Sequence, residues 1–445
     1  MKIFHAACTS GSRFPPPTLR YTRLMREVFR NRPLALLFSA NFVSMIGSGM
    51  NSAAVTWYIL QATHSEEMLG ALVIAQAIPS LLLMPFSGVV IDREDRRRVV
   101  MFLDAARGLL ILSVAILCLR GVVQVWHLFA MGVLVSTGFW MFWPTITALL
   151  QELTPEAQFA ESNAMLLAGF QGGWMVAGSI VGFVYAKIGI GGILLFDAST
   201  YAFSILCYWF VRKGRHVVAH TSIHIDKHPL ARFAHEMRDG LSFVKSNLAL
   251  AMVGSTWAVF VSAMMVNGVL TAPLSDRILH AGAVGYGWLN AGWGVGAFIS
   301  TFYAARMSHR WGWGKVVPAS MFLISLCFFF VPHSTVVGLA AGIYLASTFY
   351  FIAGSARGVG GIALSASIMQ LVPKHLMGRV QTLFSLVAII LQISLAPLAG
   401  RIAQRHSLTL ALAMIAVMYL IATTTSFWGA RASSVEPATT AVNAD

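Results

Sequence analysis

The chain has 445 residues, of which 57% are hydrophobic and only 11% are charged, and its mean hydropathy is +0.72. Soluble domains carry about 25% charged and about 45–50% apolar residues, so this composition excludes an ordinary soluble enzyme or binding domain. The net charge of +14 would suit nucleic acid, but the basic residues fall in short gaps between apolar segments and not on one soluble face. We therefore expect a membrane protein without a nucleic-acid partner.

Long apolar segments recur along the whole chain. A bilayer core about 30 Å thick needs roughly 20 apolar residues per helix, so we predict an all-α polytopic membrane protein with twelve transmembrane helices in two six-helix halves. Of the 31 Lys and Arg residues, 24 fall on one side of these spans, 5 on the other and 2 inside them, which predicts that both termini are cytoplasmic. The predicted spans are 34–60, 68–91, 99–119, 125–150, 161–186, 190–211, 247–271, 284–307, 316–332, 335–371, 378–400 and 407–428.

A long polar break separates the two halves. It ends in an amphipathic segment, because Pro229 is followed by apolar residues at helical spacing, and we expect this helix to lie along the cytoplasmic membrane surface. Four histidines recur every four residues before it, but their neighbours are poor helix formers, which favours a solvated linker over a metal site. The predicted regions are a basic cytoplasmic tail (1–33), an N-terminal six-helix bundle (34–211), the cytoplasmic linker (212–246), a C-terminal six-helix bundle (247–428) and a disordered cytoplasmic tail (429–445).

The two halves repeat one another. Gly70 and Gly287 each stand 28 residues before a basic residue that is followed by Val-Val, and these two places are offset by 217 residues. Pro155 and Pro373, which follow the fourth and tenth spans, are offset by 218 residues. An internal duplication of six spans is typical of secondary transporters, and a receptor or membrane enzyme would not need it.

The stretch "SGVVIDREDRRRVV" between the second and third spans carries a motif. Gly88, Asp92, Arg93, Arg96 and Arg97 fit the pattern G-x-x-x-D-R-x-G-R-R, in which Asp95 replaces the second glycine. With "LLQELTPEAQFAESNAML", "FDASTYAFSILCYWFVRK" and "MQLVPKHLMGRVQTLFSLV", the chain resembles the major facilitator superfamily and, more narrowly, its enterobactin-exporter and macrolide-efflux branch.

The resemblance implies a conformational latch and a substrate cavity. In this family the loop aspartate, here Asp92, faces the start of helix eleven and holds the halves together, while the nearby arginines pair with acidic groups such as Glu152 or Glu156. The cavity is lined mainly by helices one, four, seven and ten. Helix–helix hydrogen bonding is an equally good explanation for polar residues on these spans. The cavity candidates are Asn41, Ser44, Ser48, Asn51, Gln76, Trp140, Trp143, Gln171, Trp257, Asn290, Arg357 and Gln392.

Ionisable residues inside a membrane are functional candidates by default. Asp104 and Arg107 on span three and Asp197 on span six lie on helices that are peripheral in this family, which favours a structural ion pair or a packing role. Arg357 lies within "GSARGVGG" on the cavity-lining span ten, where it is expected to contact the substrate. The middle of the cavity-lining spans carries no carboxylate, which favours an anionic or neutral substrate over a cationic one.

These patterns predict secondary efflux across the bacterial inner membrane by alternating access, driven by proton antiport. A siderophore-like or other anionic to neutral amphiphilic metabolite is the first substrate class, and a macrolide-type antibiotic is the alternative within the same fold. A non-transporting membrane scaffold or sensor is the alternative of another class, but it leaves the duplication and the polar residues unexplained. We expect no enzymatic activity, no cofactor, no metal and a monomer in the lipid bilayer.

The loop motif gives a first testable prediction. Asp92→Asn should impair export while membrane insertion stays intact, because the positive charges that set topology remain and only the interaction with the helix-eleven N-terminus, worth about 0.3–1 kcal/mol, is weakened. The measurement is export by cells whose membranes contain matched amounts of wild type and variant. Normal efflux by a correctly inserted variant would contradict the latch role.

Overall fold

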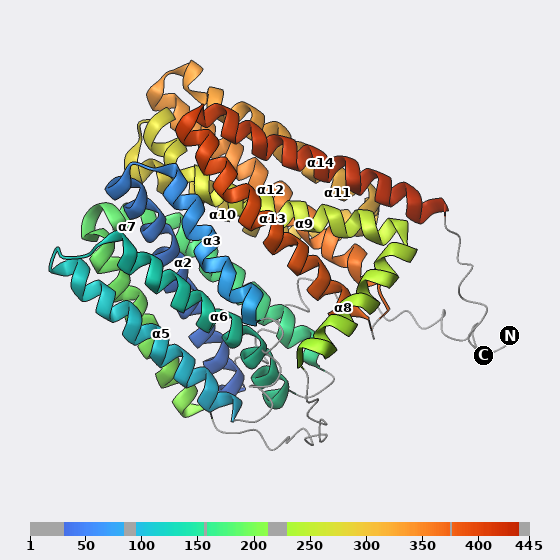
Figure 1. The fold of residues 1–445 in the computed structure, drawn as a ribbon, viewed down its shortest axis with the longest axis horizontal. Coiled ribbons are helices and arrows are strands. Elements are labelled where there is room, and N and C mark those ends of the chain that lie inside the picture. Colours follow the sequence, from blue (N-terminus) through green and yellow to red (C-terminus); the bar gives the residue numbers. More distant parts are fainter. Residues whose placement is uncertain (1–30, 84–94, 155–157, 212–228, 374–375, 436–445) are drawn as a thin grey trace, which may run out of the picture.

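The computed structural model describes residues 31–83, 95–154, 158–211, 229–373 and 376–435. Within these ranges the chain forms two helical bundles that lie side by side (Figure 1). The N-terminal bundle contains α2 (Arg32–Thr63), α3 (Glu66–Leu83), α5 (Arg96–Leu119), α6 (Val125–Leu153) and α7 (Phe159–Phe210). The C-terminal bundle contains α9 (Leu248–Pro273), α10 (Gly282–Trp311), α11 (Trp313–Phe330), α12 (Leu339–Leu371), α13 (Met377–Arg405) and α14 (Leu408–Val435).

Helix α7 crosses the membrane twice. It has 52 residues, far more than the roughly 20 that one crossing requires, and Gly189 interrupts it with φ 62° and ψ −172°. A left-handed φ of this kind favours glycine because a Cβ would be strained there. The two parts, 159–188 and 190–210, therefore match the fifth and sixth predicted spans.

The described helices confirm the predicted fold class. Nine of them are long and apolar enough to cross a membrane, judged by length and composition. Counting α7 as two crossings and adding α3 and α10, each packed between apolar helices, gives twelve crossings in two sets of six. The protein is therefore an all-α multi-pass membrane protein built from two six-helix halves.

Helix α8 (Pro229–Ser246) lies at one end of the C-terminal bundle (Figure 1). Its one polar face and one apolar face arise from the apolar residues at helical spacing after Pro229. Arg379, at the start of α13, donates from Nη1 to Asp239 Oδ2 over 2.7 Å. Gly240 lies against the Arg379 backbone, where a Cβ would be 3.3 Å from the carbonyl oxygen. The helix is thus fixed to the beginning of α13.

The two halves meet through glycine contacts. A Cβ at Gly182 of α7 would lie 2.2 Å from the Ala283 carbonyl oxygen and 2.6 Å from Gly287 Cα on α10. A Cβ at Gly70 of α3 would lie 2.6 Å from Pro397 Cα on α13. Small residues allow helix backbones to approach this closely within a membrane. The duplicated glycines Gly70 and Gly287 therefore serve the same purpose, one on each of the two seams between the halves.

Ionic contacts join the halves at the end of α13 that is opposite to α8. Glu66, at the start of α3, forms an ion pair with Arg277 of the short π-helix η2 (Leu274–Ile278), and its backbone N–H donates to Gln404 Oε1 over 2.8 Å. The adjacent Glu67 accepts from Arg405 Nε over 2.9 Å. The Glu66 side chain is 1% exposed and that of Arg277 is 49% exposed. Glu66 is therefore a buried carboxylate that depends on the opposite half for its counter-charge.

We predict that Arg277→Gln opens this end of the molecule. Removing one partner of a fully buried ion pair costs about 3–5 kcal/mol, and we expect less here because Arg277 is half-exposed. The matched control is Arg405→Gln, because the pair between Arg405 and Glu67 is exposed and such pairs are worth about 0–1 kcal/mol.

Spin labels at Ala62→Cys and Ser407→Cys, in a background lacking the native cysteines, would report the separation of the two halves. The expected result is a longer distance distribution in Arg277→Gln and little change in Arg405→Gln. Identical distributions in both variants would show that the Glu66 pair does not hold the halves together.

Candidate functional site

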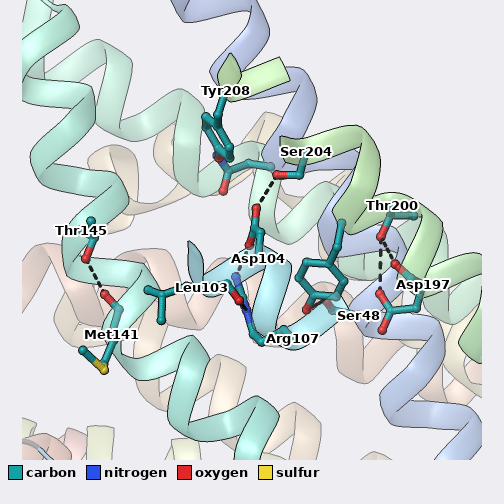
Figure 2. Close-up of polar contacts among 12 residues, drawn as sticks. Ser48, Leu103, Asp104, Arg107, Met141, Thr145, Asp197, Thr200, Ser204 and Tyr208 are labelled. Atoms are coloured by element: carbon teal, nitrogen blue, oxygen red, sulfur yellow. Dashed lines mark hydrogen bonds and ion pairs between the residues drawn. The ribbon is translucent and has the colours of Figure 1, made fainter. Parts of the chain in front are cut away.

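The N-terminal half contains an ion pair in its core. Asp104 and Arg107 lie one turn apart on α5 and bind each other directly (Figure 2). The second oxygen of Asp104 accepts from the Ser204 hydroxyl of α7 over 2.6 Å, and Arg107 Nε donates to the Leu103 carbonyl over 3.3 Å. Asp104 is 0% exposed and Arg107 is 3% exposed. The pair is therefore held away from both water and lipid.

Aromatic rings enclose the guanidinium of Arg107. Its Cζ lies 4.5 Å from the centroid of the Phe142 ring on α6 and 4.9 Å from that of the Tyr201 ring on α7. A Cβ at Gly138 would lie 2.9 Å from Arg107 Cδ, so this glycine leaves the space that the long side chain occupies. Ring faces attract a cation, and Arg107 thereby joins three helices of its half.

Asp197 of α7 is the second buried carboxylate of this half, and it is 0% exposed. Its Oδ2 accepts from Asn51 Nδ2 of α2 over 2.7 Å. The Thr200 hydroxyl approaches its Oδ1 at 3.4 Å (Figure 2). A Cβ at Gly47 would lie 2.4 Å from Oδ1, so the backbone of α2 comes directly against this carboxylate. The described partners of Asp197 are thus all electrically neutral.

The polar stripe predicted on span one faces this part of α7. Asn51 pairs with Asp197, Ser48 Oγ lies 3.1 Å from the Tyr201 hydroxyl, and Asn41 Nδ2 donates to the Tyr208 hydroxyl over 3.0 Å. These hydrogen bonds run antiparallel along α2 and α7 within one half. For these three residues the structure favours helix–helix hydrogen bonding, and their predicted role in the cavity remains a prediction.

Of the α7 partners, only Asp197 was singled out from the sequence, although a signal for the others was present. Asp197, Tyr201, Ser204 and Tyr208 recur at intervals of three or four residues and so lie on one face of a helix. Ser44, the remaining member of the span-one stripe, is buried and its hydroxyl has no hydrogen-bond partner among the described residues. Opposite it, Ser204 is engaged by Asp104. The spacing of polar residues on spans one and six therefore already predicts two matching polar stripes.

Aromatic side chains of α6 and α7 form a second feature of this half. Trp143 lies edge-on to Phe170 with 5.3 Å between ring centroids, while Phe139 and Trp174 lie 6.0 and 6.4 Å from the same ring. Of these four residues only Trp143 was a predicted cavity residue, because the candidate predicted on the fifth span was the amide Gln171. The cluster offers a flat apolar surface beside the exposed Gln171.

Arg357 occupies the core of the C-terminal half. It lies near the middle of α12, where its Nε donates to Met264 Sδ of α9 over 3.3 Å and its Cζ lies 5.6 Å from the centroid of the Trp293 ring on α10. The side chain is half-buried. Neither the thioether nor the ring carries a formal negative charge, so these contacts do not neutralise the guanidinium.

The remaining cavity candidates are spread over several helices. Gln76 of α3 lies against Gly132 of α6, and Asn290 of α10 donates to the Tyr286 carbonyl over 2.8 Å at the seam with α7, next to Gly178. In the structure the amide side chains of Gln76 and Asn290 thus lie at contacts between neighbouring helices. Trp140, Trp257 and Gln392 lie on α6, α9 and α13, with Trp140 exposed and the other two half-buried.

The arginines at the start of α5 bind within their own half. Arg96 forms an ion pair with Glu152 of α6 over 2.9 Å, which is one of the two predicted acidic partners. Arg97 Nε donates to the Tyr208 carbonyl over 2.7 Å at the C-terminal end of α7, where cations are favoured by the helix dipole. These contacts join α5 to α6 and α7 and do not cross between the halves.

The other latch residues fall outside the described part of the chain. Gly88, Asp92 and Arg93 belong to residues 84–94, and Glu156 belongs to residues 155–157. The predicted contact between Asp92 and the start of helix eleven stays a prediction.

The chain was compared with known proteins. The family model of the Major Facilitator Superfamily matches residues 37–387. The MFS-type transporter YkuC of Bacillus subtilis is 23% identical over 80% of this chain and 81% of its own length. The multidrug efflux pump Tap of Mycolicibacterium fortuitum is 28% identical over 40% of this chain and 45% of its own length. Macrolide efflux protein A of Streptococcus pyogenes is 22% identical over 50% of this chain and 54% of its own length.

A solved structure supports the fold alone. A bacterial homologue of the iron transporter ferroportin, in an inward-facing state, superposes with a TM-score of 0.70 at 16% identity, covering 91% of this chain and 99% of that one. The family match extends over both halves, and Tap and Macrolide efflux protein A are efflux proteins. With its twelve crossings and duplicated halves, the chain belongs to the major facilitator superfamily, a family of membrane transporters and not of enzymes.

Proposed function

We propose that the protein is a proton-coupled efflux transporter of the bacterial inner membrane that works by alternating access. It exports an anionic or neutral amphiphilic metabolite of the siderophore type, with both termini and the α8 linker on the cytoplasmic side. The duplicated halves, the glycine seams between them and the efflux activities in the names of two relatives support a transporter that moves its substrate outward.

The proposal of an anionic substrate rests mainly on the positive charge of Arg357. Residues 277–435 contain no Asp or Glu, and within 247–435 the single acid is Asp276 of η2. Arg357 lies near the middle of α12, remote from that short helix, and its described contacts are a sulfur and a ring. An arginine at the centre of a membrane helix costs about 2.5–3.5 kcal/mol on insertion scales. A bound anion would offset this cost.

The surroundings of Arg357 suit an amphiphilic anion. Its guanidinium can donate two parallel hydrogen bonds to a carboxylate or catecholate, which a lysine ammonium reproduces poorly. Trp293 provides a ring beside the cation, and the cluster of Phe139, Trp143, Phe170 and Trp174 provides apolar contact on the other half. A few charged groups among aromatic side chains are typical of small-molecule sites.

A macrolide-type antibiotic is the second candidate substrate. It is favoured by the similarity to Macrolide efflux protein A and by the apolar cluster on α6 and α7. The two candidates differ in charge, because Arg357 can form an ion pair with an anionic metabolite but not with a neutral or cationic macrolide.

The substrate proposal can be tested by comparing the growth medium of a deletion strain, the complemented strain and the wild type. The expected result is the loss of one or a few acidic amphiphilic compounds from the deletion medium, with recovery on complementation. Macrolide susceptibility measured in the same strains tests the alternative. A changed susceptibility with an unchanged profile of acidic metabolites would replace the first candidate by the second.

We predict that Arg357→Lys and Arg357→Gln both reduce export of the acidic compound at least tenfold. Loss of one charge-assisted pair of hydrogen bonds is worth about 1.5–3 kcal/mol, and 1.4 kcal/mol corresponds to a factor of ten. The measurement is export from cells with equal amounts of transporter in the membrane.

The matched control is Arg431→Lys. Arg431 also lies over aromatic rings, those of Phe427 and Trp428, but it does so at the end of α14. A cation that anchors a helix end should tolerate lysine, because any long basic side chain can reach the interface. Wild-type export by both Arg357 variants would remove Arg357 from the substrate site.

A further inference from the structure

The core of the N-terminal half holds an unbalanced set of charges. Asp104, Arg107 and Asp197 are 0%, 3% and 0% exposed. Figure 2 shows them near one another on α5 and α7 in two separate hydrogen-bonded groups, which interact through space and which we call the charge network. If all three were ionised, two carboxylates and one guanidinium would give a net charge of −1. Burying an uncompensated charge in a membrane protein is expensive, so such a group binds a partner or becomes neutral.

The duplicated half shows that the fold does not need these charges. The offset of 217 residues places Met321 and Ile324 of α11 at the positions of Asp104 and Arg107, and the offset of 218 places Ile415 of α14 at that of Asp197. All three apolar residues are fully buried. The helices therefore pack in the second half with methyl and thioether groups where the first half has ions.

Contacts in the structure confirm this correspondence between the halves. Ser325 of α11 donates to the Ala416 carbonyl of α14 over 2.7 Å. The equivalent residues under the same offsets are Gly108 and Ala198, and a Cβ at Gly108 would lie 3.9 Å from the Ala198 carbonyl oxygen. The equivalent helix pairs thus pack in the same register in both halves. The same helix packing therefore accommodates charged residues in one half and apolar residues in the other.

Asp197 is the member of the network without a directly bound cation, because Arg107 is bound to Asp104 and reaches Asp197 only through space. Asp104 binds Arg107 directly, whereas Asp197 accepts from the Asn51 amide and lies near the Thr200 hydroxyl, both of which are neutral. The packed helices add no second cation among the described residues. Helix α2 contributes Asn51 and Ser48, α6 contributes Phe142, α7 contributes the Tyr201 phenol, and α5 contributes the ion pair itself.

We propose that this network is a binding site for one proton, carried by the Asp197 carboxyl group. One proton makes the network neutral, and the Asn51 amide can serve both states of Asp197. Its Nδ2 donates to the carboxylate, and its carbonyl oxygen, after rotation of the amide, accepts from the protonated acid. Release breaks the O–H bond of Asp197 and transfers the proton to water. This site would supply the proton for the proton-coupled efflux proposed above, and it rests on that function only for its role in coupling.

Infrared difference spectroscopy of the purified full-length protein tests proton binding without any substrate. Solvated carboxyl groups are ionised at neutral pH, so a buried protonated carboxyl group is recognised by a C=O band that is present at neutral pH and lost at alkaline pH. Labelling with ¹³C-aspartate should shift this band in the wild type. Asp197→Asn should abolish it, and Asp239→Asn, which removes the partly exposed acid paired with Arg379, should leave it unchanged.

A charge-counting series makes the test sharper. Arg107→Gln leaves two carboxylates without a cation, so the intensity of the band should double. Asp197→Glu should replace the ¹³C-shifted aspartate band by an unlabelled glutamate band, which keeps the test usable if the asparagine variant does not fold. The triple variant Asp104→Met, Arg107→Ile and Asp197→Ile, which copies the second half, should have no band and a melting temperature no lower than that of the wild type, because buried ion networks often contribute little net stability.

Three outcomes would overturn the proposal. These are a wild-type spectrum without the pH-dependent aspartate band, a band that survives in Asp197→Asn, and a triple variant that melts well below the wild type, which would assign the charges a structural role. Because no substrate is involved, a negative result here leaves efflux itself untouched. Conversely, unchanged metabolite profiles in the deletion strain would count against efflux and leave proton binding standing.

Discussion

A charged group inside a bilayer has to find its partner within the protein, and this constraint organises the whole molecule. Asp104 and Arg107 meet it as an ion pair enclosed by two aromatic rings, and Glu66 meets it by binding Arg277 across the two halves. Asp197 and Arg357 meet it only partly, because their described partners are neutral. These two incompletely balanced groups are where we place the proton and the substrate.

After the duplication the two halves differ in the charged residues that they bury, which assigns proton binding to the first half and substrate binding to the second in our proposal. The first half keeps three ions in its core, and the second half has apolar residues at the same positions and a lone arginine elsewhere. The buried acids thus lie in one bundle, and the half-buried Arg357, without a directly bound acid, lies in the other. The bundles touch through glycine seams and through the ion pairs of Glu66 and Glu67, so a change of charge inside one bundle can change how the two bundles pack against each other.

Much of the fold was predictable from the sequence, because long apolar segments, basic gaps and internal repeats are properties of the chain itself. The spans at 161–186 and 190–211 correspond to one kinked helix, which fits the short turn at Gly189. The site was less predictable. Helical periodicity showed that Asn41, Ser44, Ser48 and Asn51 share a face, but it does not specify the neighbouring helix, and this face turned out to meet α7.

The charges near the membrane surface show the same limit. The family resemblance implied Glu152 as a partner for an arginine of the basic loop, and Arg96 does bind it. The contact nevertheless lies within one half, because α5 and α6 are neighbours in the bundle. The inter-half pairs of Glu66 and Glu67 were not predicted, since their arginines are more than 200 residues away.

The glycine seams also affect how the two halves can move against each other. At Gly182 and Gly70 backbone lies on backbone, so no side chain stands between the bundles at these two points, whereas the ring pairs Trp57–Tyr286 and Phe183–Trp288 beside them would have to slide if one bundle pivoted against the other.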